Sequence, residues 1–163
     1  MITMKLLREY IRELLFEAPN SGDLLLSKIK LAQEVFGTGR LSGGNCGTFA
    51  MALGAICEDN DISHSYGIIF EDSDLIESEV DLTEAEPDIY HVFLEAGGTW
   101  YDGDGIASVD SLLGIAAEYG DDNPGFFQGI ANTGLVGRIV RNETDWDIPT
   151  PEFYKVMTGG EEV

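Results

Sequence analysis

The sequence predicts an α+β fold in which helices pack on a small antiparallel sheet of three or four strands. Several segments repeat apolar residues every three or four positions, which is the spacing of a helix with one buried face. Other segments are short apolar runs, and one of them contains the two-glycine turn typical of a β-hairpin. The chain has 163 residues, which is long enough for one domain with a substantial core.

The first element is predicted to be an amphipathic helix over residues 1–18, because its apolar residues fall on one helical face before Pro19. These residues are Leu7, Tyr10, Ile11, Leu14, Leu15 and Ala18. We expect a single domain over residues 19–157 and a flexible tail over residues 158–163.

Within that domain, a second helix should begin with Ser21 as its N-cap and end near Gly37. The other elements follow from local composition and apolar spacing. In order, we expect a loop over 37–45, a buried helix over about 46–58, a strand over 62–70, an acidic connector over 71–88, a hairpin over 91–105, a helix over 109–119 capped by Ser108, a loop over 121–134 and a last strand over 135–141.

The hairpin register follows from its turn. If Gly97-Gly98 forms a two-residue loop, facing positions have numbers that add up to 195, starting with Ala96 and Thr99. Further along the two strands, His91 then faces Asp104, and directly opposed side chains have Cβ atoms roughly 4.5–5.5 Å apart. Asp102 lies on the same sheet face, one diagonal step away, and is the alternative partner of His91. A slip of one residue would move both aspartates to the opposite face.

Cys46 lies where a glycine-rich loop runs into the buried helix. The free N–H groups and the dipole of a helix N-terminus favour an anion, so we expect a lowered thiol pKa and a place for a developing oxyanion. Gly43, Gly44 and Gly47 leave room for a substrate to approach the backbone, so Gly44, Asn45 and Gly47 are predicted to form an oxyanion and substrate loop. Cys57 lies in the apolar part of the same helix and is predicted to be an inert core residue.

A thiol, an imidazole and a carboxylate are the groups that nucleophilic acyl chemistry requires. Cys46, His91 and Asp104 are therefore the predicted catalytic residues, with Asp102 as the alternative acid. Taken alone, each has an ordinary structural interpretation, because cysteines often fill cores and aspartates beside glycines often form turns. Their order and the hairpin register favour the catalytic interpretation. His64 is interpreted as a structural or surface residue.

These segments resemble the transglutaminase-like branch of the papain-like cysteine enzymes over roughly residues 40–106. That family has a cysteine opening a buried helix, a strand often carrying His-x-Trp-x-Glu, and a strand ending in Trp-Tyr-x-x-Asp or similar. The matching residues here are Cys46, His91–Glu95 and Trp100–Asp104. The resemblance implies a papain-like core, in which the cysteine-bearing helix packs on the sheet, and a Cys-His-Asp triad ending in Asp104.

The chain departs from this family pattern at several positions. Phe93 stands in place of the tryptophan, and Gly105 stands where a proline often follows the aspartate. No upstream glutamine or tyrosine presents itself as a second oxyanion donor, which leaves Arg40 and Asn45 as the candidates.

The charge of the chain is strongly negative, with 30 acidic and 9 basic residues and a net charge of −21. No lysine or arginine occurs between Arg40 and Arg138. This argues against nucleic acid and against an anionic membrane surface as partners, because nothing in that stretch would neutralise phosphates. The ordinary interpretation of the acidity is solubility or a salty environment. The sharper ones are a cationic partner, such as a basic protein or peptide substrate, divalent metal binding, or imitation of the charge of DNA.

The two cysteines form neither a disulfide framework nor a zinc pattern. Asp102 and Asp104 have the spacing of a calcium loop, but Leu113 stands where the bidentate glutamate belongs, so no metal or cofactor is expected. No apolar run approaches the ~20 residues that span a bilayer, and no secretory signal is recognised. We therefore expect a protein of the host cytoplasm or of a phage virion.

The virion expectation comes from residues 4–18, which resemble the capsid-targeting leaders of internal head proteins of T4-like phages. Those leaders are short amphipathic helices that the prohead protease cleaves after Leu/Ile-x-Glu. Leu15-Phe16-Glu17 is such a sequence, so the resemblance implies cleavage after Glu17, packaging in the head and injection with the DNA.

The sequence thus predicts a cysteine-dependent acyl-transfer enzyme, which is a protease, amidase, deamidase or transglutaminase-type enzyme. Cys46 would attack a carbonyl, His91 would move the proton and Asp104 would orient the imidazole. The alternative is a non-enzymatic acidic inhibitor or virion internal protein that imitates the charge of DNA.

Overall fold

A five-stranded antiparallel sheet organises the chain, with strand order β4-β3-β2-β1-β5. The computed structural model describes residues 20–42, 44–142 and 147–160. The strands are β1 (His64–Phe70), β2 (Ile89–Ala96), β3 (Thr99–Asp102), β4 (Gly105–Ala107) and β5 (Gly125–Ile130). The helices are α2 (Ser21–Phe36), α3 (Thr38–Ser42), α4 (Cys46–Asp59), α5 (Asp81–Ala85), α6 (Val109–Glu118), α7 (Thr133–Asn142) and α8 (Thr150–Met157). The predicted α+β class is confirmed.

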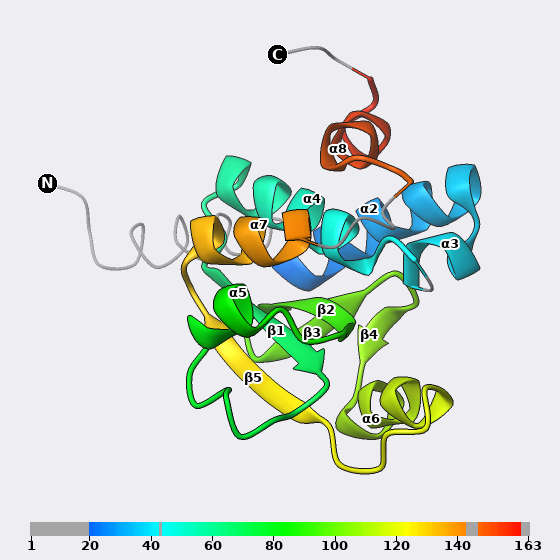
Figure 1. Ribbon diagram of the computed structural model, residues 1–163. Coiled ribbons are helices and arrows are strands. Elements are labelled where there is room, and N and C mark those ends of the chain that lie inside the picture. Colours follow the sequence, from blue (N-terminus) through cyan, green and yellow to red (C-terminus); the bar gives the residue numbers. More distant parts are fainter. Residues whose placement is uncertain (1–19, 43, 143–146, 161–163) are drawn as a thin grey trace, which may run out of the picture.

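The helices lie on both sides of the sheet (Figure 1). Helices α2, α4, α7 and α8 contribute to the main apolar core together with one face of β1 and β2. On the other side, Leu112 and Ala116 of α6 pack against Ile69 and Phe93 in a smaller buried cluster. The sheet is therefore covered on two faces, and residues on either face of β2 are buried.

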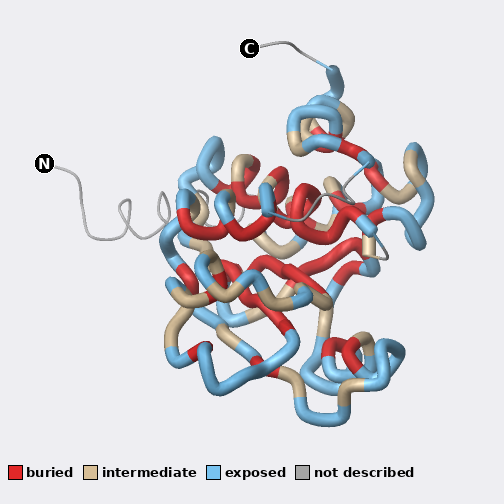
Figure 2. The backbone as a smooth tube through the Cα atoms, viewed as in Figure 1, coloured by how far each residue is buried: buried red, intermediate tan, exposed pale blue. Residues whose placement is uncertain are grey.

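Helix α4 has the longest buried stretch of the described helices, as its red stretch in Figure 2 shows. It is apolar nearly all round, with a continuous buried run from Cys46 to Ala50 and further buried residues up to Cys57. Such a helix derives its stability from surrounding elements, because it presents no polar face to water. The predicted helix over about 46–58 is confirmed.

Several other predicted elements are confirmed. The strand expected over 62–70 is β1, and the helix expected after Ser108 is α6. The Ser108 hydroxyl accepts a hydrogen bond from the Ser111 backbone N–H at 3.1 Å, while the Ser111 hydroxyl accepts one from the Ser108 N–H at 2.9 Å. This reciprocal pair is a capping box with serine in both positions.

Three predicted elements are wrong. The segment 121–134 contains the edge strand β5, so the sheet has five strands rather than three or four. Residues 135–141 belong to helix α7, because their apolar residues form one buried helical face rather than alternating. The N-cap of α2 is Asn20 rather than Ser21, since the Asn20 carboxamide accepts a hydrogen bond from the Gly22 N–H at 3.1 Å. In addition, the expected loops over 37–45 and 71–88 contain the short helices α3 and α5.

The predicted N-terminal helix over residues 1–18 and the cleavage site after Glu17 lie outside the described residues. The predicted tail overlaps the description only at residues 158–160, which follow the end of α8 at Met157. In the described ranges, no helix is both long enough and apolar enough to cross a membrane.

Candidate functional site

The N-terminus of α4 is held in place by the buried side chain of Asn45. Its Nδ2 donates to the Arg40 carbonyl at 3.0 Å and to Asp147 Oδ1 at 2.7 Å, and its Oδ1 accepts from the Ile148 N–H at 2.9 Å. Asn45 therefore connects the loop before α4 to the segment before α8. It makes no side-chain capping bond to α4 itself. The first N–H groups of a helix have no partner within the helix, so those of Cys46 and Gly47 are left uncapped by this side chain.

The carboxamide of Asn45 is therefore not free to serve as a side-chain oxyanion donor, and one nitrogen of Arg40 is engaged by Asp147. The donor and acceptor groups of Asn45 are occupied by the contacts just described. Arg40 Nη2 lies 2.7 Å from Asp147 Oδ2 in an exposed ion pair. Within the predicted substrate loop, Gly44 is exposed and an added Cβ there would meet no atom within 4 Å, whereas Gly47 is buried at the start of α4.

His91 lies in the middle of the sheet on β2, opposite Ile69 of β1, and is 0% exposed. Its Nε2 is 3.0 Å from Asp102 Oδ2. An ionised carboxylate only accepts hydrogen bonds, so Nε2 carries the proton and Nδ1 is the free basic nitrogen of the neutral ring. Nδ1 is buried and makes no hydrogen bond of good geometry with a described residue. Cys46 is the other side chain that interacts with the ring.

The environment makes His91 a strong base. Burial by itself lowers the pKa of His91, because the charged ring loses its hydration. The hydrogen bond to Asp102 and the interaction with the Cys46 thiol oppose this effect and raise the pKa of His91 to about 10. The structure therefore places the imidazole between a thiol and a carboxylate that both favour its protonated form.

The partner of His91 is Asp102 rather than Asp104. The predicted register is confirmed for the three pairs nearest the turn, which are Ala96–Thr99, Glu95–Trp100 and Leu94–Tyr101. Strand β3 then ends at Asp102, and Gly103 and Asp104 form a tight turn into β4, where Asp102 pairs with Gly105. The prediction that His91 faces Asp104 is wrong because the hairpin does not extend that far.

Asp104 contributes to the site through its backbone. Its N–H donates to Asp102 Oδ1 at 2.9 Å, so both oxygens of Asp102 are engaged. Its own carboxylate is exposed and accepts a hydrogen bond from the Ser42 hydroxyl at 3.3 Å.

Two residues that sequence reasoning missed hold the turn after Asp102. A Cβ added at Gly103 would lie 2.4 Å from Leu41 Cβ and 2.8 Å from the Leu41 carbonyl carbon, so the turn packs directly on the end of α3. Gln33 Nε2 of α2 donates to the Gly103 carbonyl at 2.8 Å. The Asp-Gly-Asp-Gly sequence signals a turn, but nothing in the sequence around Gln33 signals this contact.

The two cysteines of α4 differ in their surroundings. Cys46 at the first position of the helix is 5% exposed and lies beside His91. Cys57 near the other end is 0% exposed, and burial, with a smaller effect from Glu58, raises its pKa to about 11. His64, interpreted as structural, lies beside the turn before β1, where its Nδ1 is 3.2 Å from the Ile62 carbonyl.

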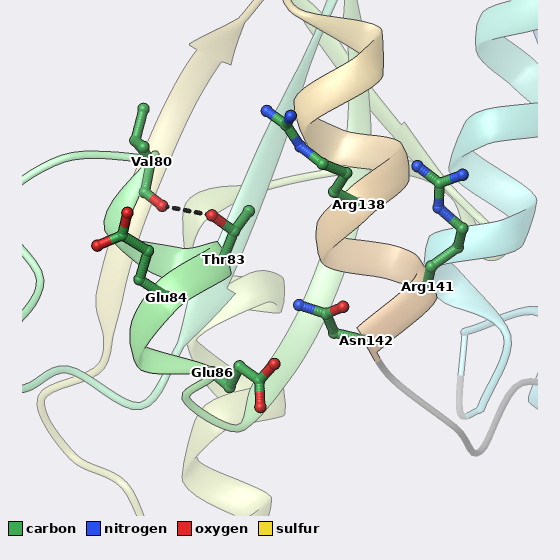
Figure 3. A pocket seen from close by; sticks show the side chains of 7 residues that line it. All are labelled: Val80, Thr83, Glu84, Glu86, Arg138, Arg141 and Asn142. Atoms are coloured by element: carbon green, nitrogen blue, oxygen red, sulfur yellow. Dashed lines mark hydrogen bonds between the residues drawn. The ribbon is translucent and has the colours of Figure 1, made fainter.

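Two cavities bear on the location of a ligand. The larger, of about 610 Å³, lies between α5 and α7 and is lined by residues of both charges (Figure 3). Figure 3 shows Arg138 and Arg141 on α7 and Glu84 on α5. Cys46, His91 and Asp102 do not line this cavity. The other, of about 300 Å³, lies between β4 and α6, and Asp102 forms part of its wall. Among the described residues, no group of three or more histidine, cysteine and acidic side chains is arranged to hold a metal ion.

Comparisons with protein-family models, with curated proteins and with solved structures found no match. Inference about function therefore depends on the geometry around Cys46, His91 and Asp102.

Proposed function

We propose that the protein is a cysteine-dependent acyl-transfer enzyme in which Cys46 is the nucleophile, His91 the general base and acid, and Asp102 the residue that orients the imidazole. The observation that carries this proposal is the position of the His91 ring. Its Nε2 is bound to Asp102 at 3.0 Å, while the thiol at the start of α4 interacts with the same ring. A nucleophile, a base and an orienting acid in this sequence of contacts form the arrangement used in acyl transfer.

In the proposed reaction, the Cys46 proton passes first to His91 Nδ1, which the raised pKa of the ring favours, and the resulting thiolate then bonds to the carbonyl carbon of an amide. The uncapped N–H groups at the start of α4 stabilise the negative oxygen that forms. The carbon–nitrogen bond then breaks, and the leaving amine takes the proton from His91. Water or a second amine attacks the resulting thioester, gives its proton to His91 and releases the acyl product, after which the sulfur recovers its proton.

The order of these residues along the chain agrees with the family resemblance drawn from the sequence. We infer a papain-like core of the transglutaminase-like type, with the cysteine on the buried helix α4, the histidine on the central strand β2 and the acid on β3. The departure is that Asp102, rather than Asp104, contacts the histidine. The product class of the second step, hydrolysis or transfer to an amine, depends on the substrate.

The test is acylation by p-nitrophenyl acetate, a small activated ester that needs no specific binding site. We expect a burst of p-nitrophenolate equal to the amount of protein, together with an acetyl group mapped to Cys46 by mass spectrometry of proteolytic peptides. The variant Cys46→Ala should show no burst, and His91→Gln should acylate about 10²–10⁴-fold more slowly, which is the usual contribution of a general base.

The matched control is Cys57→Ala, which removes the other thiol of the same helix and should keep the burst. An unchanged burst in Cys46→Ala, or an acetyl group on Cys57 instead, would overturn the proposal. Those results would favour the non-enzymatic alternative, in which the acidic surface alone acts.

A further inference from the structure

The cavity between β4 and α6 adjoins the candidate site through Asp102. It has a volume of about 300 Å³, and part of its wall is Asp102, whose carboxylate binds His91. The α6 residues that line it are spaced three, four and seven positions apart, so they form one face of the helix. The lining consists of Asp102, Asp104, Ile106, Ala107, Ser111, Gly114, Ile115 and Glu118.

The charged residues that line this cavity are all acidic. Asp104 and Glu118 are exposed, and neither forms an ion pair with a lysine or arginine in the described part of the chain. The chain has no lysine or arginine between Arg40 and Arg138, so the elements that line the cavity carry none that could neutralise Asp104 and Glu118. Carboxylates without a cationic partner at the edge of a low-dielectric cavity favour a positively charged ligand group.

The remaining wall is apolar and partly uncovered. Ile106 of β4 is 63% exposed, Ile115 is half-buried, and Ala107 lies between the strand and the helix. A lysine or arginine side chain combines an apolar stem with a charged end, so it can lie along such a wall and reach the carboxylates at the edge. Ile106 extends the apolar contact beyond the cavity, where a residue next to the cationic one would cover it.

We propose that this cavity is a docking subsite for a basic polypeptide segment, with one lysine or arginine side chain on Ile106 and Ile115 and its charge at Asp104 and Glu118. The inference rests on the proposed function, since it assigns the polypeptide to the substrate of that site. The chain's net charge of −21 adds a long-range attraction for such a partner and speeds its association.

Gly114 allows the cavity to be filled without disturbing the fold. A Cβ added there would meet no atom within 4 Å, and glycine inside a helix is replaced by other residues at no cost in helix propensity. The variant Gly114→Leu therefore occupies the space that the ligand side chain needs. Ala117→Leu is the matched control, because Ala117 is exposed on α6 and does not line the cavity.

Binding is measured in the Cys46→Ala background, so that no reaction interferes. The probe is a fluorescent, terminally blocked peptide that alternates lysine and alanine, and its affinity is followed by fluorescence anisotropy at physiological salt. We expect Gly114→Leu to weaken binding at least about tenfold and Ala117→Leu to leave it within about twofold, a difference of about 1.4 kcal/mol. Glu118→Gln should also weaken binding more than Glu84→Gln, which removes the same charge from α5.

Equal losses in Gly114→Leu and Ala117→Leu, or in Glu118→Gln and Glu84→Gln, would overturn the proposal and leave only diffuse charge attraction. Equal affinity for a peptide with glutamine in place of lysine would overturn it as well. Failure of this proposal is distinguishable from failure of the proposed function. The docking proposal is tested by peptide affinity in protein that lacks the Cys46 thiol, whereas the proposed function is tested by the p-nitrophenyl acetate burst in protein that has an unaltered cavity.

Discussion

The two cysteines of α4 have the same side chain on the same helix, but their thiols have different surroundings. Cys46 is at the first position, next to an imidazole that is bound to a carboxylate. Cys57 is in the last turn, 0% exposed among apolar residues, with its pKa raised to about 11 by burial and then by Glu58. Because the two thiols share one helix, the reactivity proposed for Cys46 depends on its place at the helix end and on the neighbouring strand, not on the helix or the residue type.

The largest expected difference is in alkylation. In the native protein at pH 8, iodoacetamide should modify Cys46 at least about 10³-fold faster than Cys57, because only the thiolate reacts and Cys57 is buried and protonated at that pH. Peptide mapping by mass spectrometry after timed quenching gives both rates in one experiment. Denatured protein is the control, since both thiols should then react alike, and comparable native rates would contradict the contrast.

A second effect should separate the two aspartates that flank Gly103. Asp102→Asn removes the charge that orients His91, and we expect the rate of Cys46 acylation to fall about 10²-fold. Asp104→Asn leaves the backbone N–H that binds Asp102, so its loss should be at least tenfold smaller. The initial p-nitrophenolate burst measures both variants. A larger loss in Asp104→Asn would indicate that Asp104, which the sequence favoured, is the acid that orients His91.

Stability should distinguish the cysteines in the reverse sense. Cys57→Ser buries a hydroxyl in an apolar site and should lower the free energy of unfolding by about 2 kcal/mol. Cys46→Ser should cost less than about 1 kcal/mol, because a hydroxyl at a helix N-terminus finds hydrogen-bond partners. Urea unfolding followed by circular dichroism gives both values, and equal losses would mean that the two environments are alike.

The remaining effects are expected in the pH dependence of stability, where each is confined to its own pH window. The pKa of His91 rises from 6.5 to about 10 on folding, so its contribution is complete below pH 6.5 and is lost as pH rises toward 10. The pKa of Cys57 rises from 9.0 to about 11, so its contribution is lost only between those values. Each group costs at most about 1.4 kcal/mol per pH unit within its window.

Urea unfolding at a series of pH values tests these windows. His91→Gln should flatten the profile between pH 6.5 and 9, whereas Cys57→Ala should flatten it only above pH 9. A wild-type profile that rises through neutral pH toward 9 would contradict the assignment for His91.

Local patterns predicted the parts of the site that local forces determine. The Gly97-Gly98 turn set the register of the pairs closest to it, and the buried run after Cys46 identified α4. The acid of the site was not predictable in the same way, because β3 ends where Gly103 packs on Leu41, far away in the sequence. The use of Asn45 as a structural bridge likewise depends on Asp147 and Ile148, which the chain reaches only after about a hundred residues.

The two wrong predictions near the C-terminus, a loop in place of β5 and a strand in place of α7, also have a physical reason. Strand β5 contains Gly125 and Gly129 and lies at the sheet edge, so its composition resembles that of a loop. Gly125 is required there, because a Cβ would lie 2.2 Å from the ring of Phe70. Helix α7 resembles a strand in composition, because it is short and rich in valine, isoleucine and leucine, and over so few residues the helical spacing of four is hard to distinguish.

The close approach of Gly103 to Leu41 has a consequence for the tolerance of this chain to sequence change. Leu41 at the end of α3 packs directly against Gly103, in the turn that holds Asp102. A larger residue at either position would displace the Asp102 carboxylate from His91 without contacting any reacting atom. In a library randomised at both sites, survivors should keep glycine at position 103 even where residue 41 is small, because an added Cβ would also meet the backbone of residues 41 and 42.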